Sequence, residues 1–185
     1  MQLRRRYAVR VRQAVEADAR ALAEVHVASW NDTYRGLIPD AAIDARTVDR
    51  REMHWIRTLS DLEQRIGVKT AEVDGWVVGF LHVGPTRSPA LGFSHELYAI
   101  YVHPDYLYGG IGRMLMSTVG TLVAPLGMTS LFAWVLRENH PARRFYESLG
   151  GVVVDERVEE MDGAGLMEVA YGYNDLDDLL AQACR

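Results

Sequence analysis

The segment Glu96-Leu-Tyr-Ala-Ile-Tyr-Val-His-Pro-Asp-Tyr-Leu-Tyr-Gly-Gly-Ile-Gly-Arg113 decides the fold of this chain. Residues 96–102 are almost continuously apolar after the glutamate, which predicts a strand buried on both faces. His103-Pro104 ends this strand, and a cluster of glycines then leads into an apolar helix predicted from about residue 110 to 124. The first N–H groups of a helix have no carbonyl partner, and glycines let a ligand approach the backbone. This order of strand, glycine-rich turn and helix indicates a site for phosphate groups.

The glycines alone do not say which ligand binds. The segment lacks Gly-Lys-Ser/Thr, so it is no nucleotide P-loop, and it does not match the Gly-x-Gly-x-x-Gly pattern of dinucleotide sites. On the glycines alone, a plain tight turn is an equally good interpretation.

The rest of the chain alternates hairpins with helical crossovers. Turns at Asp74-Gly75 and Asp162-Gly163 predict two β-hairpins, and the irregular stretch 30–39 predicts a helix end followed by a loop. The predicted strands are 7–13, 66–73, 76–83, 96–102, 130–136, 152–158 and 166–173, and the predicted helices are about 16–29, 47–59, 110–124, 141–149 and 175–183. This order predicts an α/β fold with a mixed, mostly antiparallel central sheet of about seven strands and helices on both faces. Residues 1–185 are expected to form one domain, with 174–185 as a short helical tail.

Composition argues against several kinds of partner. The net charge of −5 over 185 residues argues against a nucleic-acid ligand, and the cluster Arg4-Arg5-Arg6 is interpreted as a solvated face before the first strand. The single cysteine, Cys184, allows no intrachain disulfide and no cysteine-based zinc site, and the six histidines have no metal-ligand spacing. No apolar run approaches the roughly 20 residues of a membrane span. We therefore expect a cytoplasmic protein without metal, nucleic-acid or membrane partners.

Two blocks of residues narrow the interpretation. The first is the segment quoted above, and the second is Asn139-His-Pro-Ala-Arg-Arg-Phe-Tyr-Glu-Ser-Leu-Gly150, which has the pattern Asn-x-x-Ala-x-x-x-Tyr-x-x-x-Gly. Together they resemble the acetyl-CoA signature of the GNAT superfamily of N-acetyltransferases. The order of elements over the whole chain also fits that family, whereas the N-terminal third matches in pattern only. The resemblance implies a GNAT-like fold with acetyl-CoA as co-substrate and no metal.

The resemblance also assigns residues to the coenzyme. In the family the pantetheine arm pairs like an additional strand with the strand before the turn, and the pyrophosphate lies on N–H groups of the turn. The residues expected to bind the coenzyme are Ile100, Tyr101, Val102, Leu107, Tyr108, Gly109, Gly110, Ile111, Gly112, Arg113, Asn139, Arg143 and Tyr146.

One position departs from the family, because Leu107 stands where an arginine or glutamine is usual. The pyrophosphate would then be held mainly by backbone N–H groups. Arg113 or the pair Arg143 and Arg144 are the candidates to compensate. For the pair, a solvated helix face is the alternative interpretation.

For catalysis, the resemblance implies direct attack of an amine on the thioester. An amine attacks only when neutral, so a base must take its proton, and the departing thiolate needs an acid. Tyr146 matches the tyrosine that the family places near the coenzyme A sulfur and is the predicted acid. Glu96 is the predicted base, with His95 as a weaker candidate and a solvent-exposed carboxylate at the strand end as the alternative. Strand alternation places Glu96, Tyr98, Ile100 and Val102 on one face.

The acceptor site is expected to include Trp30, Tyr34 and Tyr98, although core packing explains Trp30 and Tyr34 equally well. The predicted function is transfer of an acetyl group from acetyl-CoA to a primary amine of a small molecule or peptide in a ternary complex. The alternative is a non-catalytic acyl-CoA-binding sensor or regulatory domain, which would need neither Glu96 nor Tyr146. The sequence leaves open the acceptor, the length of the acyl group and the choice between a monomer and a homodimer.

Overall fold

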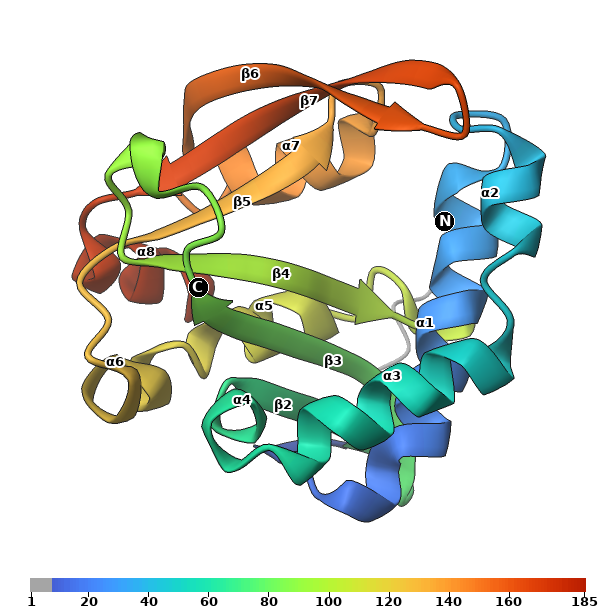
Figure 1. Ribbon diagram of the computed structural model, residues 1–185. Coiled ribbons are helices and arrows are strands. Elements are labelled where there is room, and N and C mark those ends of the chain that lie inside the picture. The colour runs from blue at the N-terminus through green and yellow to red at the C-terminus, as the bar shows by residue number, and fades with distance from the viewer. Residues whose placement is uncertain (1–7) are drawn as a thin grey trace, which may run out of the picture.

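The computed structural model describes residues 8–185 and contains a seven-stranded sheet (Figure 1). The strand order is β1-β2-β3-β4-β5-β7-β6, in which β4 and β5 are parallel and the other neighbouring pairs are antiparallel. The strands are β1 (Val9–Gln13), β2 (Val68–Val73), β3 (Trp76–Pro85), β4 (His95–Val102), β5 (Leu131–Leu136), β6 (Val152–Met161) and β7 (Ala164–Tyr173). The cluster Arg4-Arg5-Arg6 and the first residue of the predicted strand 7–13 lie outside the described residues.

Helices cover both faces of this sheet, which confirms the predicted fold class (Figure 1). Helices α1 and α3 pack on one face, and α5, α6, α7 and α8 lie on the other. The α-helices are α1 (Ala19–Tyr34), α2 (Asp40–Asp44), α3 (Val48–Ser60), α4 (Leu62–Ile66), α5 (Ile111–Ser117), α6 (Gly120–Leu126), α7 (His140–Glu147) and α8 (Leu176–Ala183). Short 3₁₀ helices occupy η1 (Glu16–Asp18), η2 (Pro89–Leu91) and η3 (Pro104–Tyr106).

Each face of the sheet carries its own apolar core. The core beneath α5 to α8 includes Leu115, Leu149 and Leu179, all fully buried. The core beneath α1 and α3 is centred on Trp55 and Phe80, which are 1% and 0% exposed. Strand β4 lies between the two cores: Ile100 and Val102 pack against the first, and Ala99 and Tyr101 pack against the second.

The predicted hairpin turns are confirmed. Asp74-Gly75 joins β2 to β3 and Asp162-Gly163 joins β6 to β7, with φ values between 48° and 83° at all four residues. A two-residue type I′ turn needs positive φ at both central positions, which explains the Asp-Gly dipeptides.

The N-terminal helices extend further than predicted. Helix α1 continues to its end at Tyr34, so Trp30 and Tyr34 lie one turn apart on a helix and not in a loop. Helices α2 and α4 were not predicted, because five residues are too few to give a helical periodicity.

The predicted helix 110–124 is divided into α5 and α6. The hydroxyls of Ser117 and Thr118 donate hydrogen bonds to backbone carbonyls three residues earlier, at 2.7 and 2.6 Å. Such local bonds compete with the regular helix, and Gly120, a poor helix former, follows directly. These three residues explain the break.

Strand β4 contains a β-bulge that simple alternation does not reveal. Leu97 pairs with Val83 and Ala99 pairs with His82, so Tyr98 between them has no partner on β3. A bulged residue shifts the side chains on either side of it relative to the regular alternation. The faces of β4 therefore change at Tyr98.

The bulge corrects part of the predicted site. Glu96 and Tyr98 share one face, as predicted, and Tyr101 joins them at the same cavity. Ile100 and Val102 instead pack against the core beneath α5 to α8. The prediction that they share the face of Glu96 was wrong, because it assumed an unbroken alternation.

Strands β4 and β5 separate soon after they meet. In the described part of the chain they pair at two positions only, His95 with Leu131 and Glu96 with Phe132. Residues 98–102 are partly exposed and not buried on both faces as predicted. Because no described strand pairs with β4 on that side beyond Glu96, the backbone groups of β4 that face the gap have no sheet partner, and the carbonyl of Val102 accepts a hydrogen bond from Ser29 Oγ at 3.0 Å.

Candidate active site

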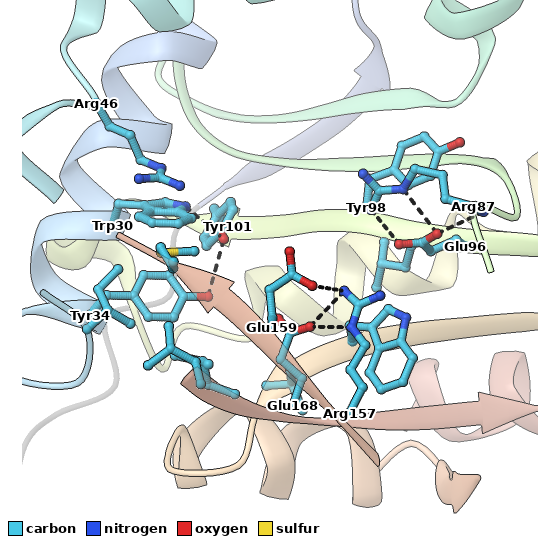
Figure 2. Close-up of a pocket in the computed structure, with 17 residues that line it drawn as sticks. Trp30, Tyr34, Arg46, Arg87, Glu96, Tyr98, Tyr101, Arg157, Glu159 and Glu168 are labelled. Carbon is cyan, nitrogen blue, oxygen red and sulfur yellow. Dashed lines mark hydrogen bonds and ion pairs between the residues drawn. The ribbon is translucent and has the colours of Figure 1, made fainter. Parts of the chain in front are cut away.

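A cavity of about 240 Å³ lies where β4 and β5 separate (Figure 2). Its walls come from α1, from the residues after β3, from β4 and β5, and from the β6–β7 hairpin. Three arginines and three glutamates are among its lining residues: Arg46, Arg87, Arg157, Glu96, Glu159 and Glu168. The formal charges of this cavity therefore balance.

Glu96, the predicted base, is buried at the wall of this cavity with 2% of its surface exposed. Its carboxylate accepts hydrogen bonds from the backbone N–H and Nε of Arg87, each at 3.1 Å, and from Arg87 Nη2. This bond to Glu96 raises the pKa of Arg87, whose guanidinium lies 4.2 Å from the centre of the Tyr98 ring. Glu96 is thus a buried and oriented carboxylate, and the interpretation as a solvent-exposed strand end was wrong.

The bulged Tyr98 lies against β3. Its hydroxyl donates a hydrogen bond to the carbonyl of Pro85 at 2.6 Å. A Cβ atom on Gly84 would lie 2.5 Å from the Tyr98 ring, so only glycine leaves room for the ring at that position. Burial raises the pKa of Tyr98, and the ring forms a fixed, neutral wall of the cavity.

Trp30 and Tyr34, the predicted substrate contacts, reach Tyr101 of β4. Trp30 Nε1 donates to Tyr101 Oη at 2.9 Å, and Tyr34 Oη lies 3.4 Å from the same oxygen. Burial raises the pKa of both phenols, so they stay protonated at neutral pH. Trp30 and Tyr34 line the cavity and also pack in the small core around Ile43. A substrate contact and core packing are therefore compatible here.

The turn between β4 and α5 presents a run of unpaired backbone donors. Within residues 8–185, the backbone N–H groups of residues 108–113 donate to no carbonyl. The first backbone hydrogen bond of the helix is donated by the N–H of Met114 to the carbonyl of Gly110 at 3.1 Å. Tyr108 and Gly110 have positive φ, 62° and 85°. Successive free N–H groups in such a turn are suited to an anionic ligand.

The side chains that were expected to replace the missing family contact have other partners. Leu107 is 39% exposed at the turn. Arg113 Nη2 donates to Ser148 Oγ at 3.0 Å, and Arg143 Nε donates to Tyr171 Oη at 3.0 Å. Both guanidinium groups thus join elements of the fold, which does not favour a phosphate contact by either side chain. The backbone N–H groups of the turn are then the remaining candidates to bind phosphate.

Asn139 is the N-cap of α7, and Tyr146 lies within this helix. Asn139 Oδ1 accepts the N–H of Ala142 at 3.2 Å and caps the helix, and its amide nitrogen, which has no partner within the described residues, is available to a ligand. The Tyr146 ring stacks on Tyr171 with 5.8 Å between centroids, and its hydroxyl forms no hydrogen bond within residues 8–185. Burial raises the pKa of Tyr146, so this hydroxyl is protonated and available as a donor.

The β6–β7 hairpin carries a charged pair that was not predicted from the sequence. Arg157 and Glu168 are cross-strand neighbours, and Arg157 Nε donates to Glu168 Oε2 at 2.8 Å. The Arg157 guanidinium also lies 4.2 Å from the centre of the Trp134 ring. Counting the register outward from Asp162-Gly163 would have paired these two residues.

His95, the weaker candidate base, does not line this cavity. Its Nδ1 lies 3.1 Å from Ser94 Oγ.

In the described part of the chain, no helix is both long and apolar enough to cross a bilayer. Residues 8–185 also contain no group of three or more His, Cys, Asp or Glu side chains that could hold a metal ion.

Comparison with known proteins gives consistent results. Residues 24–151 match the Acetyltransferase (GNAT) family. The chain is 35% identical over 173 residues to the N-acetyltransferase YuaI of Bacillus subtilis (strain 168), an alignment that covers 92% of this chain and 96% of the relative. It is 30% identical over 154 residues to the L-amino acid N-acyltransferase MnaT of Escherichia coli (strain K12), covering 77% of this chain and 79% of the relative.

Solved structures share the fold. The acetyltransferase yncA from Salmonella typhimurium, determined with its cofactor acetyl-CoA, superimposes with a TM-score of 0.64 at 24% identity. The match covers 90% of this chain and 94% of that structure.

Proposed function

Because this chain belongs to the Acetyltransferase (GNAT) family, we propose that it transfers an acetyl group from acetyl-CoA to the primary amine of a small molecule in a ternary complex. The observation that carries this proposal is the separation of β4 from β5 after Glu96, beside a cavity lined by aromatic and charged residues. Unpaired strand backbone can bind an extended ligand as an additional strand. The same gap gives the acceptor access to that ligand.

The residues present are suited to acetyl-CoA. The backbone of residues 100–102 has no neighbouring strand on the β5 side and would hold the pantetheine arm. The free N–H groups of residues 108–113 would hold the pyrophosphate without a polar contact from the side chain of Leu107. The amide nitrogen of Asn139 is a further candidate contact. The bound coenzyme supplies an acetyl thioester, which is activated toward an amine.

Two side chains would manage the protons. Glu96 would take a proton from the attacking amine, directly or through one water, because its buried carboxylate lines the cavity at the edge of the gap. The Tyr146 hydroxyl would donate to the sulfur as the thiolate departs, since it has no partner within the described residues and stays protonated.

The size of the cavity favours a small acceptor. Its volume of about 240 Å³ is below the roughly 300–1,000 Å³ of sites for drug-sized ligands. Trp30, Tyr34 and Tyr98 would contact the acceptor. The relative MnaT, named as an L-amino acid N-acyltransferase, supports a small amino compound.

The coenzyme assignment is tested by thermal unfolding with acetyl-CoA. At 100 times the dissociation constant, binding stabilises the folded state by about 2.7 kcal/mol, which for a chain of this size raises Tm by roughly 5–10 °C. Absence of any shift contradicts the coenzyme site. Release of free thiol from acetyl-CoA is then measured with a panel of amines. A shift in Tm with acetyl-CoA, but no thiol release with any amine, would support the non-catalytic sensor.

The proposed base is tested by Glu96→Gln, which keeps the size of the side chain. We expect kcat to fall about 10²-fold or more. Glu168→Gln is the matched control, because Glu168 lines the same cavity and also pairs with an arginine. If Glu168→Gln shows the loss and Glu96→Gln does not, the base is Glu168.

A further inference from the structure

A second cavity, of about 410 Å³, lies between α1, α3, α4 and the β3–β4 pair. It adjoins the first cavity along a shared wall, since Trp30, Arg87, Tyr98 and Tyr101 line both. These four residues are labelled in Figure 2, where Trp30 and Tyr101 lie on one side of the view and Arg87 and Tyr98 on the other. The second cavity thus borders the proposed acceptor site.

Three buried ring nitrogens of the second cavity have no hydrogen-bond partner. They are Nδ1 of His26, Nε1 of Trp55 and Nε2 of His82, in side chains that are 7%, 1% and 6% exposed. The Trp55 ring centre lies 6.2 Å from that of His26 and 5.6 Å from that of His82, so one small group can reach more than one of them. A buried polar atom left unpaired costs about 1–3 kcal/mol.

These rings offer donors and carry no charge themselves. The indole N–H donates only, and a neutral imidazole can present its proton on either nitrogen. Burial lowers the pKa of His26 well below its ordinary value and that of His82 to about 4, so both are neutral at pH 7. The cavity therefore suits a ligand that accepts hydrogen bonds.

The charged residues of the second cavity are all basic. Arg51 and Arg87 line it, and none of the lining residues found in the described chain is an aspartate or glutamate. The Arg51 guanidinium is partly buried and forms no hydrogen bond or ion pair within residues 8–185. Burial, and then the nearby Arg46, lower the pKa of Arg51. An anion would relieve this cost, whereas water would satisfy the hydrogen bonds and leave the charge unbalanced.

We infer that the second cavity binds an acidic group of the acceptor, a carboxylate or a comparable oxyanion, while the amine of the same molecule lies in the first cavity. This inference rests on the proposed function and narrows it to amines that carry an acid, such as amino acids. The placement of the carboxylates supports it: three glutamates line the first cavity beside three arginines, whereas no carboxylate among the described residues lines the second, which has Arg51 and the Trp55 N–H for an anion.

The test compares acceptors that differ in the acid alone. L-methionine is paired with 3-(methylthio)propylamine, and L-phenylalanine with phenethylamine, at saturating acetyl-CoA. Rates of thiol release are corrected for the fraction of neutral amine, because the amine pKa differs within each pair. We expect kcat/KM to be at least about tenfold higher for the acid-bearing member, as for a charge-assisted contact.

The variant Arg51→Gln should reduce this preference about tenfold or more. Arg57→Gln is the matched control: it removes the same charge from the same helix, α3, but Arg57 is exposed and does not line the cavity. The Arg57→Gln variant should keep the same preference for the acid-bearing acceptor as the unaltered protein. Thermal unfolding of both variants verifies that they fold.

Two results would overturn the inference. Equal kcat/KM within each pair removes the acid subsite but leaves the proposed function standing. If no amine releases thiol, the proposed function fails, and the subsite is then judged by binding alone: N-acetyl-L-methionine must raise Tm more than N-acetyl-3-(methylthio)propylamine.

Discussion

Replacement of Tyr146 by phenylalanine should separate catalysis from coenzyme binding. The phenylalanine ring keeps the stacking on Tyr171, 5.8 Å between centroids. The lost hydroxyl has no hydrogen-bond partner within the described residues, so its removal leaves no orphaned group. The free energy of unfolding should therefore change by less than about 1 kcal/mol, and the affinity for acetyl-CoA should stay nearly the same.

Turnover should fall much more than stability. A donor aimed at charge that develops in the transition state contributes about 3–4 kcal/mol, so kcat should fall roughly 10²-fold to 10³-fold. The donor works only while protonated, and its contribution is lost as the pH rises through its folded pKa. Burial raises the pKa of Tyr146 above the ordinary value of about 10, so the contribution should persist to at least pH 9.

Single-turnover thiol release and acetyl-CoA titration by thermal shift measure the two effects. Tyr173→Phe is the matched control, because its buried hydroxyl donates to the carbonyl of Tyr146 at 3.0 Å and so supports the same turn of chain. This control should cost about 1 kcal/mol of stability and leave kcat unchanged. An unaltered kcat in Tyr146→Phe, or an equal loss in Tyr173→Phe, would refute the assignment of Tyr146 as the acid.

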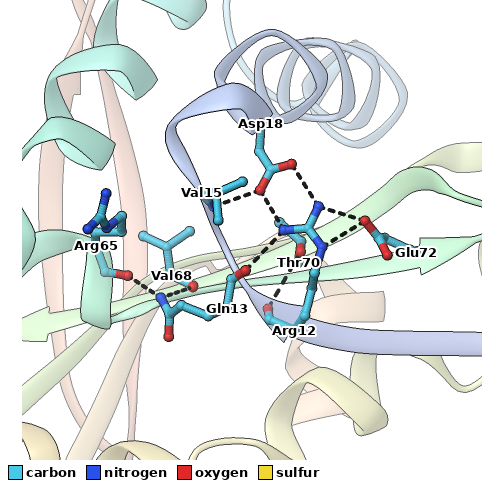
Figure 3. Close-up of polar contacts among 8 residues, drawn as sticks. All are labelled: Arg12, Gln13, Val15, Asp18, Arg65, Val68, Thr70 and Glu72. Atoms are coloured by element: carbon cyan, nitrogen blue, oxygen red, sulfur yellow. Dashed lines mark hydrogen bonds and ion pairs between the residues drawn. The ribbon is translucent and has the colours of Figure 1, made fainter.

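Two further predictions concern the fold. Asp18 accepts hydrogen bonds from Arg12 at 2.7 and 2.8 Å and from the N–H of Val15 at 2.8 Å (Figure 3); burial acts to raise its pKa, but these bonds outweigh it and the pKa is lowered. Asp18→Asn should lower the free energy of unfolding, measured by urea titration, by about 2 kcal/mol at pH 7. The difference in the free energy of unfolding between the variant and the unaltered protein should shrink as the pH falls below about 3.9. An equal difference at pH 2.5 and pH 7 would contradict this. In Gly112→Ala the new Cβ would lie 3.2 Å from the Phe145 ring, so Tm should fall by a few degrees and partly recover when Phe145→Leu is added.

Local patterns were sufficient for most of the fold. The Asp-Gly turns fixed both hairpins because few other residues adopt positive φ at two successive positions. Pro141 lies in the first turn of α7 as predicted, whereas the helix ends at Glu147, two residues before the predicted end, and Gly150 with φ of 83° follows in the turn beyond the C-cap Ser148. In each case the deciding interaction lies within a few residues of the signal.

The parts that sequence reasoning missed depend on contacts between distant segments. The bulge at Tyr98 requires the close approach of Gly84 on a neighbouring strand, which no periodicity within β4 reveals. Similarly, the unpaired nitrogens of His26, Trp55 and His82 belong to three elements that only tertiary packing brings to one cavity. Each residue taken singly is an ordinary core side chain.

The separation of β4 and β5 connects the two faces of the sheet. Tyr146 packs in the core beneath α5 to α8, whereas Arg51 and the second cavity lie toward α1 and α3. Leu97 and Val135 belong to the core of Tyr146 and also line the first cavity, so that cavity reaches into the gap. A continuous sheet would keep an amine on one face away from a thioester on the other.

The position of Glu96 gives this gap a chemical consequence. Pairing of β4 with β5 stops at Glu96, so the carboxylate stands at the margin of the opening, between the acceptor cavities and the face that carries Tyr146. The single cysteine of the chain, Cys184, lies beyond the end of α8 and lines neither cavity. No thiol is therefore placed to carry the acetyl group, which favours one displacement, with a base on one side of the gap and an acid on the other. Initial rates should accordingly give intersecting double-reciprocal plots, and parallel plots would indicate an acetyl-enzyme intermediate instead.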